Sequence, residues 1–280
     1  MNGIVIVQQS GRLGNQLHMY AATQEIFKKR IIVYLGFNEL NHICTDLNGI
    51  HIKSSQKISF KRTKKYLEKL ANHGIISNIF EKSEKSVPIH EVSGLLSKIY
   101  YAKECYFQNN WSIEQIKNPP EIKNLYKDKA KSWIERNAPL HATLIFLHIR
   151  RGDYLYWPSE THPAVLSMDY YKSAMSMLRD KVPNPHFIIM GDDQKFMHDN
   201  FFNTENCTIS QCDHFTDLSI MKNCTHGILS ASTFAWWGAF LSRSQNNFKE
   251  NLFIAPKYWA GHTKKEWFPN NFKAKWMNYI

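Results

Sequence analysis

The sequence predicts an α/β protein composed of two units of similar size. Apolar runs of strand length, bounded by glycine, proline or asparagine, alternate with longer amphipathic stretches, which is the pattern of strands connected by helices. The chain has 280 residues, of which 43% are hydrophobic and 14% aromatic, so it can bury a sizeable core and fits two domains of ordinary size. We place the boundary near residue 138, which gives units of 1–138 and 139–280.

The first unit begins with a strand, a helix and a second strand. The apolar run at 4–7 predicts the first strand, residues 8–15 a loop, 16–30 a helix and 31–35 the second strand. The stretch from 40 to 138 is polar and rich in lysine, which favours helix or loop, with a strand near 100–107.

The second unit shows the same alternation more clearly. Strands are expected at 143–148, 186–190 and 227–230, with a last strand at 251–255 that is closed by a proline. Helices are expected at 169–180, at 217–223 and from Ser232 or Thr233 onward. Ligands of open α/β sheets bind outside the carboxyl ends of the strands, so the residues that follow these strands are the candidates for a site.

Composition excludes several classes of protein. No stretch approaches the ~18 consecutive apolar residues of a membrane-spanning helix, and the first residues lack the basic leader of a signal peptide. The five cysteines are odd in number and form no Cys-x-x-Cys pair, which argues against a disulfide framework or a zinc site. We therefore expect a cytoplasmic protein with reduced thiols.

The formal charge of +11 points to an acidic partner, which can be a nucleic acid, an anionic lipid or a phosphorylated substrate. Basic residues concentrate in the segment 53–69, between apolar and aromatic side chains. They are Lys53, Lys57, Lys61, Arg62, Lys64, Lys65 and Lys69. The segment fits either a solvated helix face, which we favour, or a patch that lies against an anionic membrane on the inner side of the cell.

The most informative motif is His-Ile-Arg-Arg-Gly-Asp-Tyr, residues 148–154, directly after an apolar run. Only eight of the 35 basic residues are arginines, and two of them, Arg150 and Arg151, stand side by side here. A guanidinium fork suits bidentate contact with phosphate oxygens. Gly152 permits a sharp turn, and Asp153 can hold an arginine or contact a substrate hydroxyl. A structural Arg–Asp pair in a loop is the alternative.

Two further motifs also follow predicted strands. Gly-Arg-Leu-Gly-Asn-Gln, residues 11–16, precedes the first helix, where backbone N–H groups favour anions and hydroxyls. Ser-Ala-Ser-Thr-Phe-Ala-Trp-Trp-Gly, residues 230–238, offers Ser232 or Thr233 as the N-cap of a helix whose start can hold a phosphate, while the paired tryptophans anchor it in the core. An ordinary glycine loop and an ordinary capped helix explain the same residues.

The three motifs together resemble those of the α-1,2-fucosyltransferases of glycosyltransferase family 11, in the same order and spacing, over residues from Gly3 to about Trp259. The resemblance implies a GT-B fold, in which two Rossmann-like domains face each other across a cleft. It also implies metal-independent transfer of L-fucose from GDP-β-L-fucose to a galactose 2-hydroxyl, with inversion. Two departures concern His18 and Ala231, where the family pattern has Phe and Asn, and they leave fine substrate contacts open.

The resemblance also assigns roles to residues. Domain 1–138 would face the acceptor and domain 139–280 would bind GDP-fucose. Arg150 and Arg151 would contact the diphosphate, His148 would lie near the nucleotide, and Arg12 and Asn15 would face the fucose and the acceptor. The implied donor-binding residues are Arg12, Gly14, His148, Arg150, Arg151, Asp192, Ser232, Thr233 and Phe234. The implied catalytic residues are Asn15, His18, Arg150 and Asp153.

Inversion requires the acceptor hydroxyl to lose its proton to a carboxylate or histidine within hydrogen-bond reach. Asp153, His18 and Glu160 are candidates, and a late proton transfer without a dedicated base is a further alternative. The expected acceptor is a galactose-terminated oligosaccharide or lipid-linked glycan of the O-antigen type. A fucosyltransferase of the wider superfamily with another linkage remains an alternative.

Two rival functions come from other features. Gly-Asp-Asp, residues 191–193, follows a strand and suits a hard cation, as in metal-dependent glycosyltransferases. A diphosphate that is already bound by arginines needs no metal, so we expect none. The positive charge suggests a non-catalytic nucleic-acid binder, but the sequence has no recognisable motif of that class, and we expect no nucleic-acid partner.

Overall fold

The computed structural model describes residues 3–53, 60–81, 90–103, 105–108, 116, 119–246, 251–259 and 272–280. By contacts, the chain divides into an N-terminal unit, Met1–Glu121 with Asn270–Lys273, and a C-terminal unit, Ile122–Pro269 with Ala274–Ile280. The division precedes helix α4 (Asn124–Asn137), whereas the sequence places its boundary after this helix. Helix α4 packs on α7 (His214–Asn223), where the Tyr126 and Phe215 rings lie 5.5 Å apart.

The N-terminal unit contains a six-stranded sheet in the order β4-β2-β1-β7-β5-β6, in which only β6 runs antiparallel to its neighbour. The strands of this sheet are β1 (Ile4–Gln8), β2 (Ile31–Leu35), β4 (Ile50–Ile52), β5 (Ile76–Phe80), β6 (His90–Val92) and β7 (Leu96–Lys103). The other elements of this unit are α1 (Leu13–Ile26), α2 (Asn38–Ile43), α3 (Phe60–Asn72) and the two-residue strand β3 (Cys44–Thr45). The two-residue strand β8 (Glu121–Ile122) includes the point of the chain at which the two units divide. Val5 and Val7 of the central strand β1 are fully buried.

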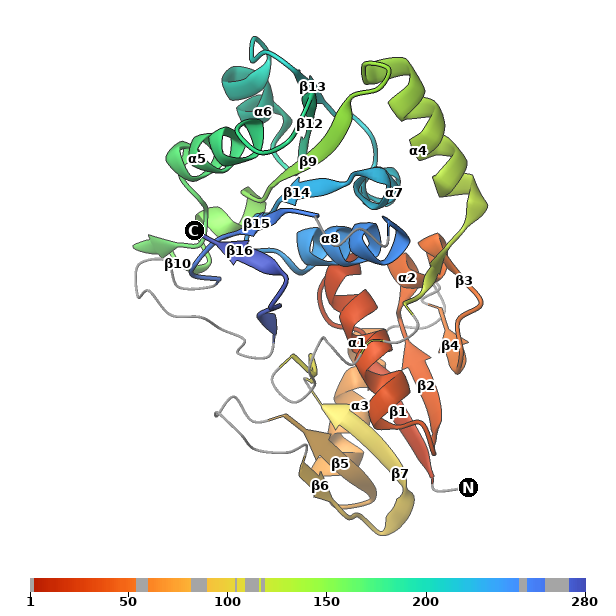
Figure 1. The fold of residues 1–280 in the computed structure, drawn as a ribbon. Helices are drawn as coiled ribbons and strands as arrows, with labels where there is room; N and C mark the ends of the chain where they lie inside the picture. The colour runs from red at the N-terminus through yellow and green to blue at the C-terminus, as the bar shows by residue number, and fades with distance from the viewer. Residues whose placement is uncertain are drawn as a thin grey trace. The chain divides into compact units, whose positions relative to one another are not determined.

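The C-terminal unit contains a six-stranded sheet in the order β13-β12-β9-β14-β15-β16, and all of its strands are parallel (Figure 1). The strands of this sheet are β9 (Thr143–Ile149), β12 (Pro185–Gly191), β13 (Cys207–Ile209), β14 (His226–Ile228), β15 (Phe253–Ala255) and β16 (Met277–Tyr279). Besides α4 and α7, the helices are α5 (Met168–Arg179), α6 (Gln194–Phe201) and α8 (Thr233–Asn246). A short helical turn (Gly152–Leu155) and a hairpin of β10 (Pro158–Ser159) and β11 (His162–Pro163) follow β9.

The strand order of the C-terminal sheet is that of a Rossmann fold. If β9 is taken as the first strand, the chain proceeds outward to β12 and β13, then returns to β14 on the other side of β9. This is the order 3-2-1-4-5-6, whose direction reverses between strands 1 and 4. The reversal lies between β9 and β14, and loops at their carboxyl ends diverge there, which is where ligands of such sheets bind.

The strands and helices that the sequence predicts for the C-terminal unit are present. The structure also contains elements that the sequence analysis did not predict. The strand at 251–255 is not the last one, because β16 pairs with it. Helices α4 and α6 and strand β13 were not predicted. In the N-terminal unit, the first helix begins at Leu13 rather than near residue 16. Among the described residues, no helix is long and apolar enough to cross a membrane.

Helix α7 carries a buried carboxyl group in its first turn. Asp217 is 6% exposed and accepts a hydrogen bond from the Ser210 hydroxyl at 2.5 Å. Burial raises the pKa of Asp217 to about 7, and the charge of Asp213 adds to the effect, while the bond from Ser210 opposes it. Since a free Asp titrates near pH ~3.9, the folded state holds the proton over a pH range in which the unfolded chain has lost it.

Asp217→Asn is expected to make the stability of the protein less dependent on pH. As the pH rises from about 4 towards 7, the wild type loses about 1.4 kcal/mol per pH unit from this group, and the asparagine variant does not. Urea unfolding should show the variant gaining roughly 2–3 kcal/mol over the wild type between pH 5 and pH 8. A constant difference over that range would contradict the prediction.

Candidate active site

Arg150 is held by carboxylates from two neighbouring strand ends. It follows β9 directly, and its Nη1 lies 2.7 Å from Oδ2 of Asp192, the residue after β12. Its Nη2 donates to Oδ1 of Asp153, three residues further along its own loop. The Asp192 side chain is 22% exposed and that of Asp153 is 66% exposed. Asp153 is therefore the partner that an incoming anion can replace most easily.

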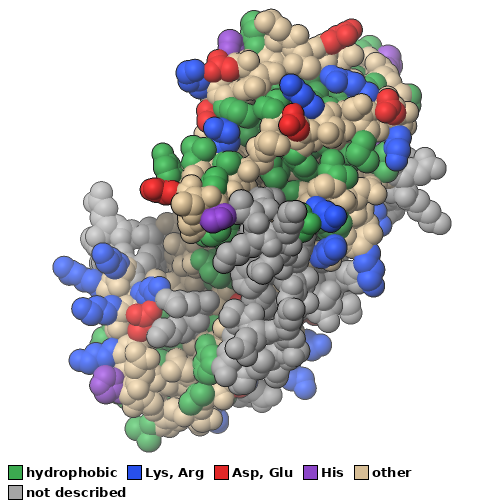
Figure 2. All heavy atoms as spheres, turned by 90° about the vertical axis from the view of Figure 1, so that its left-hand side faces the viewer, with side chains coloured by type: hydrophobic (Ala, Val, Ile, Leu, Met, Phe, Trp, Pro, Cys, Tyr) green, Lys and Arg blue, Asp and Glu red, His purple; other side chains and the backbone are tan. Residues whose placement is uncertain are grey.

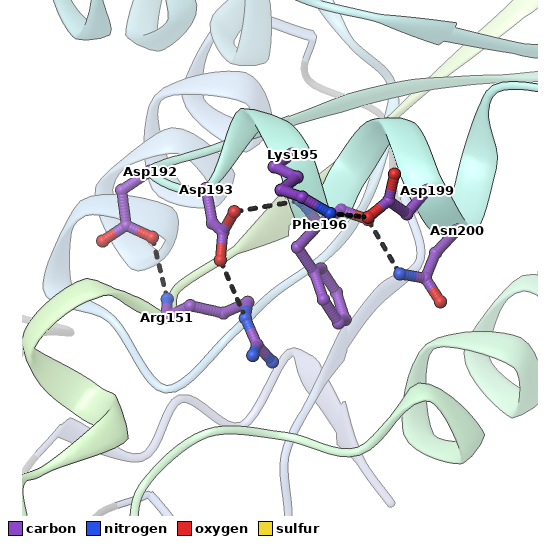
Figure 3. Close-up of polar contacts among 7 residues, drawn as sticks. All are labelled: Arg151, Asp192, Asp193, Lys195, Phe196, Asp199 and Asn200. Carbon is purple, nitrogen blue, oxygen red and sulfur yellow. Dashed lines mark hydrogen bonds and ion pairs between the residues drawn. The ribbon is translucent and has the colours of Figure 1, made fainter.

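Arg151 is held by the two carboxylates that follow β12 (Figure 3). Its backbone N–H donates to Oδ1 of Asp192 at 2.8 Å, and its Nε donates to Oδ2 of Asp193 at 3.1 Å. The guanidinium lies over the Phe196 ring, 4.0 Å from its centroid. Asp193 is also the N-cap of α6, where it accepts from the Phe196 N–H. Both carboxylates of the Gly-Asp-Asp motif thus bind arginines.

The close approach of Asp192 to Arg150 depends on the glycine between the arginines and Asp153. A Cβ at Gly152 would lie 2.7 Å from Oδ2 of Asp192, which is closer than real Cβ atoms come. From the other side, Tyr171 of α5 forms a hydrogen bond with the backbone of Arg150 and is 1% exposed. Residues from the end of β12, from the loop after β9 and from α5 therefore all contribute to holding Arg150 in place.

His148 connects the two strands between which the sheet reverses. It lies at the end of β9, and its Nδ1 is 2.7 Å from the hydroxyl oxygen of Ser230, which follows β14. Burial, with the charge of Arg150 as a second cause, lowers the pKa of His148 to about 3. The imidazole is neutral at physiological pH, so His148 shapes this edge of the sheet without adding charge. Its ring lies 5.4 Å from that of Phe234.

Helix α8 begins at the same edge. Ser232 precedes the first helical residue, Thr233, and its hydroxyl oxygen accepts from the Phe234 N–H at 3.3 Å, which is the geometry of an N-cap. Trp236 and Trp237 are fully buried, which confirms that the tryptophan pair anchors the helix. The start of this helix thus presents backbone N–H groups and the positive end of its dipole.

In the N-terminal unit, the Gly-Arg-Leu-Gly-Asn-Gln loop follows β1. Gly11 has a φ of +72°, and a Cβ there would lie 2.3 Å from Nδ2 of Asn15, so this turn requires glycine. Oδ1 of Asn15 accepts from Nε2 of Gln108, which follows the neighbouring strand β7. Arg12 is exposed, whereas Gly14 is buried in the first turn of α1.

His18, one of the predicted catalytic residues, is a core residue of α1. Its side chain is fully buried, its Nε2 lies 3.3 Å from the carbonyl oxygen of Phe107, and its ring is 5.0 Å from that of Phe272. Burial lowers the pKa of His18 to about 4. A general base must reach the substrate proton, so we assign His18 to the packing of α1. Glu160 is exposed, in the turn between β10 and β11.

The sequence did not single out two residues that support Arg150 and His148. The motif that contains Ser230 directed attention to Ser232 and Thr233. The available signal for Ser230 was its position at the end of the predicted strand 227–230. Tyr171 lies on the buried side of an ordinary amphipathic helix, and no local pattern distinguishes it. Arginine forks and a helix N-terminus at one edge of a parallel sheet can bind an anion such as a diphosphate.

The chain belongs to glycosyltransferase family 11, because the model of that family, described as "Glycosyl transferase family 11", matches residues 97–280, more than half of the chain. The O-antigen biosynthesis glycosyltransferase WbnK of Escherichia coli is 28% identical over 92% of this chain and 95% of its own. An α-1,2-colitosyltransferase of Escherichia coli is 24% identical over 91% of this chain and 92% of its own.

The fold is GT-B-like, with two Rossmann-like units. The solved structure of the α-1,6-fucosyltransferase NodZ from Bradyrhizobium, co-crystallised with GDP, superposes with a TM-score of 0.53 over 86% of this chain and 93% of that one. Only 11% of the residues are identical, so this likeness concerns the fold.

Proposed function

We propose that this family 11 glycosyltransferase transfers L-fucose from GDP-β-L-fucose to the 2-hydroxyl of a galactose residue, with inversion and without a metal ion. The 1,2 linkage is supported by the three motifs and by the α-1,2-transferase among the relatives. An acceptor of the O-antigen type is supported by the relative in O-antigen biosynthesis. The donor is supported by the resemblance of the motifs.

The observation that carries the proposal is the convergence of three polar segments at one edge of the C-terminal sheet. Strands β12, β9 and β14 are adjacent, and their carboxyl ends carry the Asp192–Asp193 pair, the Arg150–Arg151 pair and the start of α8. A nucleotide diphosphate needs both cationic forks and backbone N–H donors. This edge supplies both, so we assign donor binding to the C-terminal unit and a part in acceptor binding to Arg12 and Asn15 of the N-terminal unit.

The chemical step builds negative charge on the leaving diphosphate while the sugar gains oxocarbenium character. In our proposal, Asp192 keeps its contact with Nη1 of Arg150, and the diphosphate takes the Nη2 side in place of Asp153. The guanidinium is then already oriented when charge develops, so little reorganisation is needed. Ser232, Thr233 and Phe234 contribute the N–H groups and the hydroxyls at the helix start.

No role is left for a metal at the Gly-Asp-Asp motif in this proposal. Oxygens of Asp192 and Asp193 accept hydrogen bonds or ion pairs from Arg150 and Arg151. A cation there would have to compete with two guanidinium groups that already balance the carboxylate charge.

Displacement of Asp153 also suggests the base. Once the diphosphate has replaced it on Arg150, this exposed carboxylate is free to turn toward the acceptor hydroxyl, which in an inverting reaction attacks from the face of the sugar opposite the leaving group, and to accept its proton. We therefore propose Asp153 as the general base, in preference to the exposed Glu160 in the hairpin.

A second candidate donor is a nucleotide-linked colitose, because one relative is named as a colitosyltransferase. Parallel assays with the two donors decide between them. The strand-end site serves either donor through the diphosphate.

Transfer should proceed in the presence of EDTA. Incubation of the protein with GDP-fucose and galactose-terminated acceptors should release GDP and give a product in which NMR shows α-linked fucose on the galactose 2-oxygen. Loss of GDP release on chelation, restored by Mg²⁺ or Mn²⁺, would overturn the metal-free proposal. Another linkage in the product would overturn the acceptor assignment.

Arg150→Lys should lower kcat by about 10²–10³, because a point charge replaces a planar fork that binds Asp192 through one nitrogen and the leaving diphosphate through the other. The thermal unfolding temperature should change little, since lysine still places a positive charge between Asp153 and Asp192. The matched control is Arg136→Lys on the exposed face of α4, which should retain full activity. Near wild-type turnover in Arg150→Lys would make Arg151 the better candidate.

Asp153→Asn should lower kcat by about 10²–10⁴ if this carboxylate is the base, while GDP affinity measured by calorimetry stays the same or rises. The rise is possible because asparagine competes less strongly than aspartate for Arg150. Glu160→Gln serves as the control and should keep its activity. A kcat within a few-fold of wild type in Asp153→Asn would favour transfer without a dedicated base.

A further inference from the structure

Helix α3 carries a basic face that the proposed transfer reaction does not use. Lys61, Lys65 and Lys69 are exposed and follow one another at four-residue intervals, so they lie on one side of the helix. Arg62 is also exposed, and the Tyr66 side chain next to it is 63% exposed. Of the basic segment 53–69, residues 54–59, including Lys57, lie outside the described part of the chain.

Acidic side chains do not neutralise this face from within the helix. Glu68 is the one acidic residue of α3, its side chain is 25% exposed, and it pairs with Lys64 at 3.7 Å. The opposite side of the helix is apolar, with Ala71 buried against Ile76 and Tyr101. Packing of α3 therefore orients the lysines toward solvent.

Apolar side chains are exposed just beyond the end of α3. Ile75 is 37% exposed, Leu96 48% and Leu95 84%. Backbone hydrogen bonds tie them to the helix end, from Leu95 N to Gly74 O at 2.6 Å and from Leu96 N to Ile75 O at 2.7 Å. In Figure 2 basic side chains gather at the lower left edge, and hydrophobic ones lie at the lower end.

We propose that these residues form a membrane-docking face for anionic lipid headgroups. We define the face as Lys61, Arg62, Lys65, Tyr66, Lys69, Ile75, Leu95 and Leu96. Lysines attract an anionic surface within a Debye length, while tyrosine and leucine side chains enter the boundary between headgroups and acyl chains. A nucleic acid would match the cations but not three exposed aliphatic side chains. The inference is independent of the proposed donor and linkage.

Vesicle sedimentation of the full chain tests the proposal. The wild type should bind vesicles of phosphatidylcholine with phosphatidylglycerol, and should neither bind neutral phosphatidylcholine vesicles nor remain bound at high salt. Replacing Lys61, Lys65 and Lys69 by alanine together should weaken binding about 100-fold, at about five-fold per lysine. Leu95→Ser should weaken binding as well, by several-fold, because the exposed leucine would no longer be inserted.

A matched control removes the same charge elsewhere. Alanine at Lys129, Lys131 and Lys172, which are exposed in the C-terminal unit, should leave binding within a few-fold of wild type. The α3 variant should keep wild-type transfer to a soluble acceptor, which separates docking from catalysis and shows that it folds. Equal vesicle binding by both triple variants would overturn the proposal, and so would wild-type binding to neutral vesicles. An α3 variant that loses binding to an added oligonucleotide but keeps its binding to anionic vesicles would overturn it as well.

Discussion

The candidate site depends on the ion pairs between two adjacent arginines and the carboxylates that surround them. Two guanidinium groups in consecutive positions repel each other, and partly buried charges need partners. Asp192 provides one contact to the Arg150 side chain and another to the Arg151 backbone, and Asp193 binds the Arg151 side chain. These contacts preorganise the arginines before any ligand is present, which is the condition for strong electrostatic stabilisation of a leaving group.

The pairs exist because of the register of the sheet. Gly191 at the end of β12 pairs with Ile149 at the end of β9, so the residues that follow the two strands emerge side by side. On the other side of β9, β14 brings Ser230 to His148 in the same way. A one-residue shift in either register would turn these side chains to the opposite face. The buried apolar strands thus position a polar edge.

The sequence predicted this edge well, because each strand there is a strongly apolar run that ends abruptly in Gly, Asp, Arg or Ser. It predicted the N-terminal unit less well. Strand β5 contains Ser77 and Asn78, which hide its pattern, and the local sequence around His18 does not reveal that its side chain is buried. The pairing of Arg150 with Asp192 was not predicted, since contacts across strands depend on register and not on local sequence.

Hydrogen–deuterium exchange with and without GDP tests the location of the donor site most directly. If the donor binds at the carboxyl edge of β12, β9 and β14, GDP should slow exchange in peptides that cover residues 150–155, 192–196 and 232–236, with the rest of the C-terminal unit little changed. Protection confined to the loop after β1, or to segments that exclude all three peptides, would contradict this account.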